Sequence, residues 1–482
     1  MNDGLFFLSD LADEDIAWLL DAGDEGQVIS ETVVLVEGKP ADALAFVLAG
    51  LVGVRMSSIP GRRLATLGPG EMLGEMGFLE ERPASATVFA VENTQLLRVP
   101  FARLREEIAA RPDFGARFFR SIALTGSRRL REREQHYARL LAAERTTAAA
   151  GEDVWSGLEP TIEAFKQALQ AADKAALKED GVLPDEVVAG IRAGFAGFVR
   201  TLNDAIGDAS GLDEAVRDEV GARVQREVLP YLLLTKSAER LYAKPRGYAG
   251  DFKSIDWIYA DEAAGTGRLG PLLDRCFLDE PAAAAVRNRR GLLARAIRRH
   301  LDAHPDRPVR ITSMACGPAR EIFDVIDELG DASRFEATLI DIDQQALEQV
   351  QAEIDRRGIG DHLRTVHGNL IFLAMGRQKI DLAEQDLMYS IGLIDYFNDK
   401  LVTKLMNWGS ATLRTGGEMI LGNFHPQNPD KALMDHVLEW RLIHRSEADM
   451  DRLYEGSGFG RPTTRIEFEE GGVNLFASCE RS

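Results

Sequence analysis

The strongest constraint on the fold is a regular alternation of strand-like and helical segments after about residue 300. The strand candidates are 309–314, 337–340, 363–367, 386–390 and 418–421, with helical patterns such as 344–357 between them. Strands that alternate with helices in this rhythm are typical of βαβ units. Such units build a parallel, doubly wound sheet, which binds ligands beyond the carboxyl ends of its strands. We therefore predict an α/β domain with a ligand site at that edge.

A glycine turn and a carboxylate follow the first two of these strands. The first strand runs into Ala315-Cys-Gly-Pro-Ala-Arg-Glu321, and the second ends in Leu339-Ile-Asp-Ile-Asp343. Gly317 lets a ligand approach the backbone because glycine has no Cβ. A carboxylate about twenty residues after such a turn suits the hydroxyls of a ribose, and we assign this role to Asp341. Asp343 is better placed as the cap of the next helix; the alternative is a structural glycine and two capping aspartates.

The cofactor that this edge implies is S-adenosylmethionine rather than a dinucleotide. A dinucleotide domain favours a G-x-G-x-x-G turn that holds a pyrophosphate, whereas this turn has Gly-Pro-Ala-Arg. The order of elements over about residues 285–482 resembles the class I methyltransferases, which implies a Rossmann-like fold. We assign the cofactor contacts to Ala315, Gly317, Arg320, Asp341, Asn369, Ser390 and Gly392, and we expect no metal.

A closer resemblance begins upstream of this domain. The segments that carry it are Arg240-Leu-Tyr-Ala-Lys-Pro-Arg-Gly-Tyr-Ala-Gly-Asp251, Val286-Arg-Asn-Arg-Arg290, the turn 316–321 and Gly422-Asn-Phe-His-Pro426. Together they resemble the PhcB-like methyltransferase family over about residues 225–482. Members of that family are described as making methyl esters of 3-hydroxy fatty acids, which serve as quorum-sensing signals. The resemblance implies a methyltransferase with a small-molecule acceptor, such as a fatty acid.

An acceptor carboxylate suits the side chains of these segments. A carboxylic acid is ionised near neutral pH, so its methylation needs no strong general base and depends mostly on positioning. We expect Arg246 to hold the carboxylate and Tyr248 to wall the site, with Arg320 and Lys244 as alternative cations. His425 would serve as a base if the acceptor were a hydroxyl or an amine. The alternatives are N- or C-methylation of another small molecule, and a non-enzymatic sensor of the cofactor or of a nucleotide.

Short strand-like runs before about residue 100 predict a β-roll with flanking helices. The segments 38–50, 67–77 and 82–88 resemble the cyclic-nucleotide-binding roll. The resemblance implies that Gly74 and Glu75 open a phosphate-binding cassette, whose arginine position is Ala84 here. Losing a charge-assisted contact to phosphate costs about 1.5–3 kcal/mol. We therefore expect a degenerate domain that serves assembly or another ligand, not binding of a cyclic nucleotide.

A helical middle zone separates the roll from the α/β domain. A run of small residues at 146–151 is typical of a linker, and apolar residues such as Phe195, Phe198 and Leu202 follow at helical spacing. We predict a roll at 1–145, a helical domain that caps the substrate at 146–270 and a methyltransferase domain at 271–482. Glutamates interleave with the arginines of 128–139, so we interpret that stretch as a solvated helix.

The composition argues against several other classes of function. Lys and Arg number 57 and Asp and Glu 77, a net charge of −20, which disfavours broad binding to nucleic acid. No stretch approaches the roughly 18 apolar residues of a membrane helix, and the acidic first residues do not resemble a signal peptide. The three cysteines have no CxxC spacing, so we expect a reducing compartment. We predict a cytoplasmic homodimer.

Overall fold

The computed structural model describes residues 11–56, 65–68, 71–80, 82–124, 149–178, 183–246 and 248–482. It divides into two compact units. One contains the described residues before 125 together with Pro245–Tyr248, and the other contains residues 149–244 and 249–482. The predicted helical and methyltransferase domains therefore lie in one unit. The arginine-rich stretch and the first half of the predicted linker, residues 146–148, lie outside the described residues, and the second half, 149–151, begins a helix.

The N-terminal unit contains two four-stranded antiparallel sheets, of order β1-β8-β3-β6 and β2-β7-β4-β5. Their strands are β1 (Asp24–Val28), β2 (Val33–Leu35), β3 (Ala43–Ala49), β4 (Val52–Arg55), β5 (Ala65–Leu67), β6 (Met72–Leu73), β7 (Thr87–Ala90) and β8 (Thr94–Pro100). Its helices include α2 (Asp13–Ala22), α3 (Glu75–Glu80) and α4 (Phe101–Ala110), and residues 112–124 are also helical. Side chains from both sheets, among them Val47, Val52 and Val88, form one core. The predicted roll with flanking helices is confirmed.

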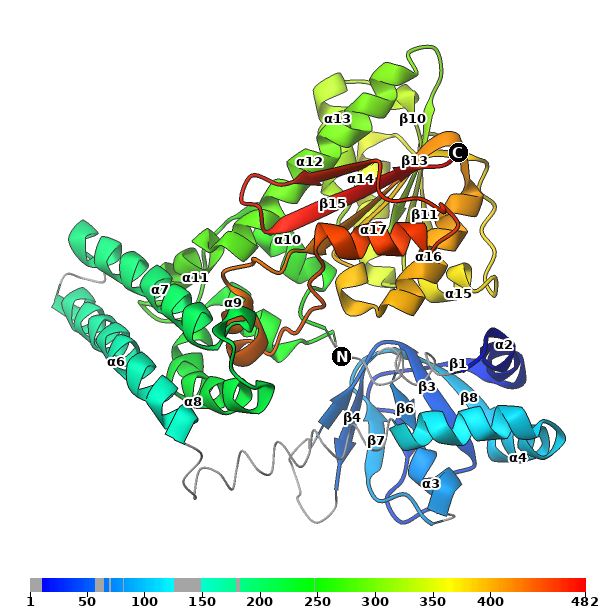
Figure 1. Ribbon diagram of the computed structural model, residues 1–482, viewed down its shortest axis with the longest axis horizontal. Coiled ribbons are helices and arrows are strands. Elements are labelled where there is room, and N and C mark those ends of the chain that lie inside the picture. Colours follow the sequence, from blue (N-terminus) through cyan, green and yellow to red (C-terminus); the bar gives the residue numbers. More distant parts are fainter. Residues whose placement is uncertain are drawn as a thin grey trace. The chain divides into compact units, whose positions relative to one another are not determined.

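Helices form the first part of the second unit (Figure 1). They are α6 (Ala149–Lys178), α7 (Asp185–Ile206), η1 (Asp208–Ser210), α8 (Glu214–Leu232), α9 (Lys236–Ala243), α10 (Phe252–Ala260), α11 (Gly270–Asp279) and α12 (Pro281–Ala303). Phe165, Phe195 and Phe198 pack ring against ring between α6 and α7, with centroids 5.8 to 6.4 Å apart. The apolar spacing in the sequence thus marks the inner faces of these helices. No helix in the described ranges is long and apolar enough to cross a membrane.

The second part of this unit is a seven-stranded sheet of order β11-β10-β9-β12-β13-β15-β14. The strands are β9 (Val309–Met314), β10 (Phe335–Asp341), β11 (Leu363–His367), β12 (Gln385–Ile391), β13 (Leu413–Phe424), β14 (Arg465–Phe468) and β15 (Asn474–Glu480). The first five in this order pair in parallel, and β15 pairs antiparallel with both of its neighbours. After β9, the chain adds β10 and β11 on one side of this strand and then β12 and β13 on the other. The point where the strand order reverses, the switch point, therefore lies between β9 and β12.

Helices cover both faces of this sheet. They are α12, α13 (Arg320–Leu329), α14 (Gln344–Arg357), α15 (Leu370–Ala374), α16 (Asp399–Thr412) and α17 (Glu447–Glu455), with the short turns η2 (Ala332–Arg334), η3 (Ile394–Tyr396) and η4 (Leu433–Val437). Tyr389 and Ile420 share a core with α12, α13 and α14. The neighbouring residue Met419 points the other way, where a Cβ on Gly409 of α16 would be 2.7 Å from its sulfur. Because successive side chains of a strand alternate between faces, α16 covers the opposite side.

Candidate functional site

The loop between β9 and α13 has an unusual backbone. Ala315, Gly317 and Ala319 have positive φ angles of 54°, 51° and 48°, and this conformation costs a residue with a Cβ about 1–2 kcal/mol. Strained backbone of this kind clusters in functional loops. A Cβ on Gly317 would find Cβ of Phe252 as its nearest neighbour, at 3.9 Å. The space over the glycine is therefore open to a ligand.

Asp341 connects this loop to the carboxyl end of β10. One oxygen of its carboxylate accepts the backbone N–H of Gly317 at 2.8 Å, and the other accepts that of Asp343 at 2.9 Å. Burial raises the pKa of Asp341 to about 6, although the backbone donors act to lower it. A carboxylate offers about four acceptor positions. Each oxygen thus keeps capacity for a ligand hydroxyl.

Two further side chains at this edge begin helices. The carboxylate of Asp343 accepts the N–H groups of Gln345 and Ala346 at the start of α14, so its predicted capping role is confirmed. Asn369 was predicted to contact the cofactor, and its Oδ1 accepts the N–H of Ile371 at 3.0 Å as the cap of α15. The cap uses only the oxygen of the amide. A contact with an adenine ring would have to come from its NH2 group.

Two predicted cofactor residues, Ser390 and Gly392, lie at the end of β12, where Gly392 contacts Arg289, a residue with no predicted role. The hydroxyl of Ser390 is buried and donates to the carbonyl of Met314 at 2.8 Å, which ties β12 to β9. Gly392 follows the strand with φ of +71°, and a Cβ there would be 3.0 Å from Nη1 of Arg289 on α12. Arg289 lies within the segment Val286–Arg290, but the sequence predicts no role for this arginine. Its position beside Gly392 follows only from the packing of α12 over the end of β12.

Two further contacts at this edge involve carboxylates, one with Arg320 at the start of α13 and one with Tyr389 of β12. Arg320, predicted to contact the cofactor, pairs with Asp256 of α10 through Nε at 2.5 Å. Glu321 accepts the hydroxyl of Tyr389 at 2.7 Å, and both side chains are buried. Burial raises the pKa of Glu321 and of Tyr389. These contacts attach the start of α13 to α10 on one side and to the sheet on the other.

Arg240 of α9 and Asp251, the residue before α10, form an ion pair that we call the clasp. The guanidinium of Arg240 donates to both oxygens of Asp251 at 2.8 Å. The same carboxylate caps α10 by accepting the N–H groups of Lys253 and Ser254. Asp251 is fully buried. This motif of the sequence therefore positions α10, the helix that carries Phe252 beside the glycine turn.

The residues predicted to contact the acceptor are spread over the chain. Arg246 and Tyr248 lie between α9 and α10 in the segment Pro245–Tyr248, which is grouped with the N-terminal unit. His425 follows β13; its Nε2 is 3.1 Å from Oε2 of Glu447, and its Nδ1 accepts the N–H of Gln427. Lys244 ends α9, where burial lowers its pKa. The acceptor roles of Arg246, Tyr248 and His425 stay predictions.

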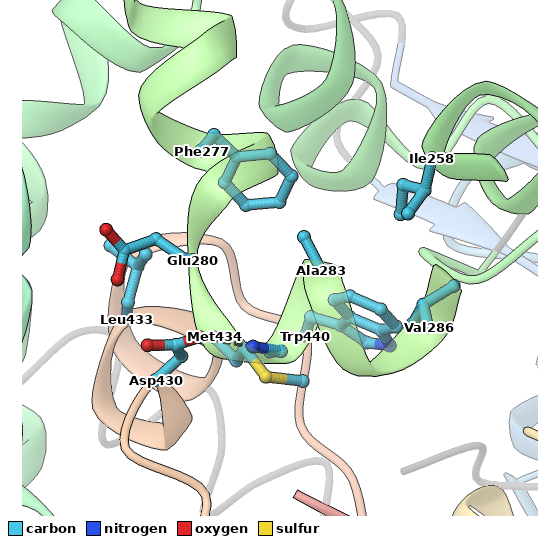
Figure 2. A pocket seen from close by; sticks show the side chains of 10 residues that line it. Ile258, Phe277, Glu280, Ala283, Val286, Asp430, Leu433, Met434 and Trp440 are labelled. Carbon is cyan, nitrogen blue, oxygen red and sulfur yellow. Dashed lines mark hydrogen bonds between the residues drawn. The ribbon is translucent and has the colours of Figure 1, made fainter. Parts of the chain in front are cut away.

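A small cavity lies between α11, α12 and η4 (Figure 2). Its volume of about 10 Å³ holds no more than one water molecule. Apolar side chains form most of its wall, and the carboxyl groups of Glu280 and Asp430 lie on the same side of it. Burial, together with the charge of the neighbouring acid for Glu280, raises the pKa of Glu280 to about 8, and burial raises that of Asp430 to about 6. The cavity is too small to be the acceptor site in this conformation.

The cassette of the roll keeps its glycine corner. Gly74 has φ of +85°, and a Cβ there would be 2.7 Å from the carbonyl oxygen of Ala43. Glu75 begins α3 directly after it. Ala84 exchanges backbone hydrogen bonds with Gly38 and Lys39. Arg82 is exposed and lies 3.8 Å from Glu80. The nearest arginine in this sequence thus faces an acid of its own segment.

These features describe an antiparallel roll followed along the chain by helices and an α/β domain, and comparison with known families matches both the roll and the α/β domain. Residues 243–474 match the family model described as "Putative methyltransferase", and residues 27–111 match that of the cyclic nucleotide-binding domain. The chain thus carries a methyltransferase domain preceded by a cyclic nucleotide-binding domain.

Three curated relatives share parts of the chain. Glutaminase 2 of Bradyrhizobium diazoefficiens is 33% identical over 26% of this chain and 19% of its own length. The uncharacterized protein YnbC of Escherichia coli is 24% identical over 44% of this chain and 37% of its own. The cyclic AMP receptor protein of Thermus thermophilus is 38% identical over 20% of this chain and 45% of its own. The chain spans less than half the length of each relative.

Proposed function

We propose that the chain is an S-adenosylmethionine-dependent methyltransferase of the class I type that converts the carboxylate of a small acid to a methyl ester. A hydroxy fatty acid is the acceptor class that we favour. The observation that carries the proposal is the hydrogen bond between Gly317 and Asp341 at the switch-point edge of the sheet, within the region that matches the methyltransferase family.

The residues at this edge fit the proposed cofactor. S-adenosylmethionine has a ribose, an adenine and an amino acid but no pyrophosphate. The remaining acceptor positions of Asp341 suit the two ribose hydroxyls, and the open space over Gly317 admits a ligand close to the backbone. The amide of Asn369 has its NH2 group left for the adenine edge. When bound, S-adenosylmethionine supplies an electrophilic methyl group on a sulfonium sulfur.

In the reaction, the residues of this chain bind and orient the two reactants and exclude water from the site. An ionised carboxylate needs no residue to remove a proton from it, so positioning accounts for most of the catalysis. Burial of Tyr389 and Glu321 beneath the turn supports a dry wall on the sheet side of the site. We assign the acceptor to Arg246 and Tyr248, and we keep His425 as the base for a hydroxyl or amine acceptor.

The resemblance to the PhcB-like family supports the choice of acceptor. Two residues of its first segment, Arg240 and Asp251, form the clasp of α10, and Arg289 of its second segment contacts Gly392 at the end of β12. A role in quorum sensing follows if the ester is a signal, and we propose that the enzyme works in the cytoplasm as a homodimer. The roll, with Ala84 in place of a phosphate-binding arginine, then serves assembly or another ligand.

The proposal is tested with the full-length protein, methyl-labelled S-adenosylmethionine and a series of 3-hydroxy fatty acids. We expect a labelled product that mild alkali releases as methanol, because esters hydrolyse under conditions that leave methylated amines intact. The rate should change little between about pH 8 and pH 6, since the acceptor stays ionised over this range. An alkali-stable product would assign an amine or carbon acceptor instead, and absence of cofactor binding would favour a non-enzymatic sensor.

A further inference from the structure

Arg289, a buried cation at the switch point, has no anionic partner among the described residues; among them, its guanidinium makes a polar or ring contact only with Tyr259, whose ring centroid is 6.0 Å away. Arg289 is 5% exposed, and its Nε lies 3.4 Å from the hydroxyl of Tyr259, which is a long hydrogen bond. Among the residues that the structure describes, none brings a carboxylate oxygen within ion-pairing distance of this guanidinium. Its two terminal nitrogens also have no acceptor there, yet they are not sealed from solvent.

The neighbouring polar residues of α12 are all paired with acids. Arg287 lies 3.4 Å from Asp261, Asn288 donates to Glu469, and Arg290 is bound to Asp324. Residues one or two positions apart on a helix point in different directions. Arg289 therefore points away from its paired neighbours.

The nearest buried acids already have other donors. Glu321 accepts the hydroxyl of Tyr389 at 2.7 Å, and Asp395 accepts the N–H of Phe424 at 2.8 Å. The positive charge of Arg289 lowers the pKa of both acids, although burial acts more strongly and raises them. A guanidinium stays charged at any pH a protein tolerates. Burying it without a contacting anion costs several kcal/mol, so the free protein holds a charge that a ligand can satisfy.

The position of the guanidinium is where a ligand is expected. A Cβ on Gly392 would be 3.0 Å from Nη1 and 3.5 Å from Nη2 of Arg289. The absence of a side chain thus lets the fork rest against the backbone at the end of β12. The turn of Gly317 ends the adjacent strand β9. Both lie at the carboxyl edge of the switch point, where doubly wound sheets bind ligands.

We propose that Arg289 is the receptor for a carboxylate in this site. The inference rests on the proposed methyltransferase function and deepens it by adding an anion-binding residue. The planar fork of a guanidinium binds a carboxylate through two parallel hydrogen bonds. Two sources carry this group: the fatty acid acceptor, and the amino-acid part of S-adenosylmethionine.

The test is titration calorimetry on the full-length protein and its Arg289→Gln variant with three probes. S-adenosylhomocysteine carries the amino-acid carboxylate, 5′-methylthioadenosine has the same nucleoside without it, and 3-hydroxydecanoate represents the acceptor. We expect the variant to lose tenfold or more in affinity for one carboxylate probe and to keep its affinity for 5′-methylthioadenosine. A loss of affinity for S-adenosylhomocysteine would show that Arg289 binds the carboxylate of the cofactor. A loss of affinity for 3-hydroxydecanoate would show that it binds the carboxylate of the acceptor. Arg287→Gln, on the same helix, should bind all probes as the unmodified protein does.

A melting curve without ligand distinguishes a receptor from a structural arginine. Removing an unpaired buried charge should leave the melting temperature unchanged or raise it. A lower melting temperature together with weaker binding of 5′-methylthioadenosine would indicate a structural role and overturn the proposal. Unchanged affinity for both carboxylates would also overturn it, while binding of S-adenosylhomocysteine by the unmodified protein would leave the methyltransferase proposal standing. If the unmodified protein binds neither S-adenosylhomocysteine nor 5′-methylthioadenosine, the methyltransferase proposal fails. The role of Arg289 is then decided by the affinity for 3-hydroxydecanoate alone.

Discussion

Gly317 and Asp341 are joined by a hydrogen bond of 2.8 Å that connects the turn after β9 to the carboxyl end of β10. The glycine exposes its N–H to the carboxylate, and the buried carboxylate in turn holds the backbone of Asp343. One side chain thus sets the relative position of two strand ends. We therefore expect a ligand that binds the remaining acceptor positions of Asp341 to lie beside the turn of Gly317.

Replacing Asp341 with Ala should weaken binding of S-adenosylhomocysteine by tenfold or more, about 1.4 kcal/mol. The variant loses the acceptor that we assign to the ribose hydroxyls. It also leaves the N–H groups of Gly317 and Asp343 without this acceptor, so Asp341→Asn, which keeps the shape, should be measured beside it. Titration calorimetry gives both affinities. Asp343→Asn is the control, because asparagine still caps α14, and unchanged affinity in a folded Asp341→Ala would remove Asp341 from the site.

Replacing Asp251 with Ala should lower the free energy of unfolding by about 3 kcal/mol, because it removes a helix cap and one partner of a buried ion pair. Arg240 would then lose both of its 2.8 Å contacts. Urea unfolding followed by tryptophan fluorescence measures the loss. Asp173→Ala removes an exposed ion pair with Arg268 and should change the free energy by less than about 0.5 kcal/mol. Equal effects of the two variants would contradict the clasp.

The pair of Glu280 and Asp430 should make the protein less stable as the pH rises. Burial raises the pKa of Glu280 from 4.5 to about 8. An acid whose pKa is higher in the folded state contributes stability that is complete below its unfolded pKa and is lost as the pH passes its folded pKa. The melting temperature should therefore fall between about pH 4.5 and pH 8, where only the folded state keeps the proton, and should level off above that range. We expect Glu280→Gln to flatten this decline and the exposed-site variant Glu455→Gln to preserve it; parallel slopes in all three proteins would exclude the pair as the cause.

The roll should not bind cyclic AMP or cyclic GMP with a dissociation constant below about 10 μM, since a phosphate without a cation pays an uncompensated desolvation cost. Introducing the cation with Ala84→Arg should create binding that fluorescence titration can measure. Adding Glu75→Ala to that variant should abolish it, because the ribose contact implied by the family is then lost. Low-micromolar binding by the unmodified protein would instead make the enzyme directly responsive to the nucleotide.

Sequence patterns predicted the parallel strands well and the antiparallel edge poorly. Strands β9 and β11 have the predicted bounds. β9 lies inside the sheet and is buried along five of its six residues, whereas β11 is an edge strand and only partly buried. The strands β14 and β15 were not predicted. β15 is buried along six of its seven residues without alternation, and a short run of this kind does not distinguish strand from helix. The strand expected at 418–421 is longer than predicted: β13 begins at Leu413 and continues through Gly416, which has a positive φ of 76°, with a shift in register.

By itself the sequence determined the local features of this protein: the alternation of strands and helices, the glycine turn, the carboxylate after β10 and the capping role of Asp343. Each depends on residues close together in the chain, where spacing and backbone preferences act directly. Only the tertiary structure decided which distant side chains meet. Arg289 lies against Gly392, Arg320 pairs with Asp256, and Glu280 and Asp430 line the same cavity. Burial and charge pairing are set by the packing of α10 and α12 against the sheet, and no local pattern encodes them.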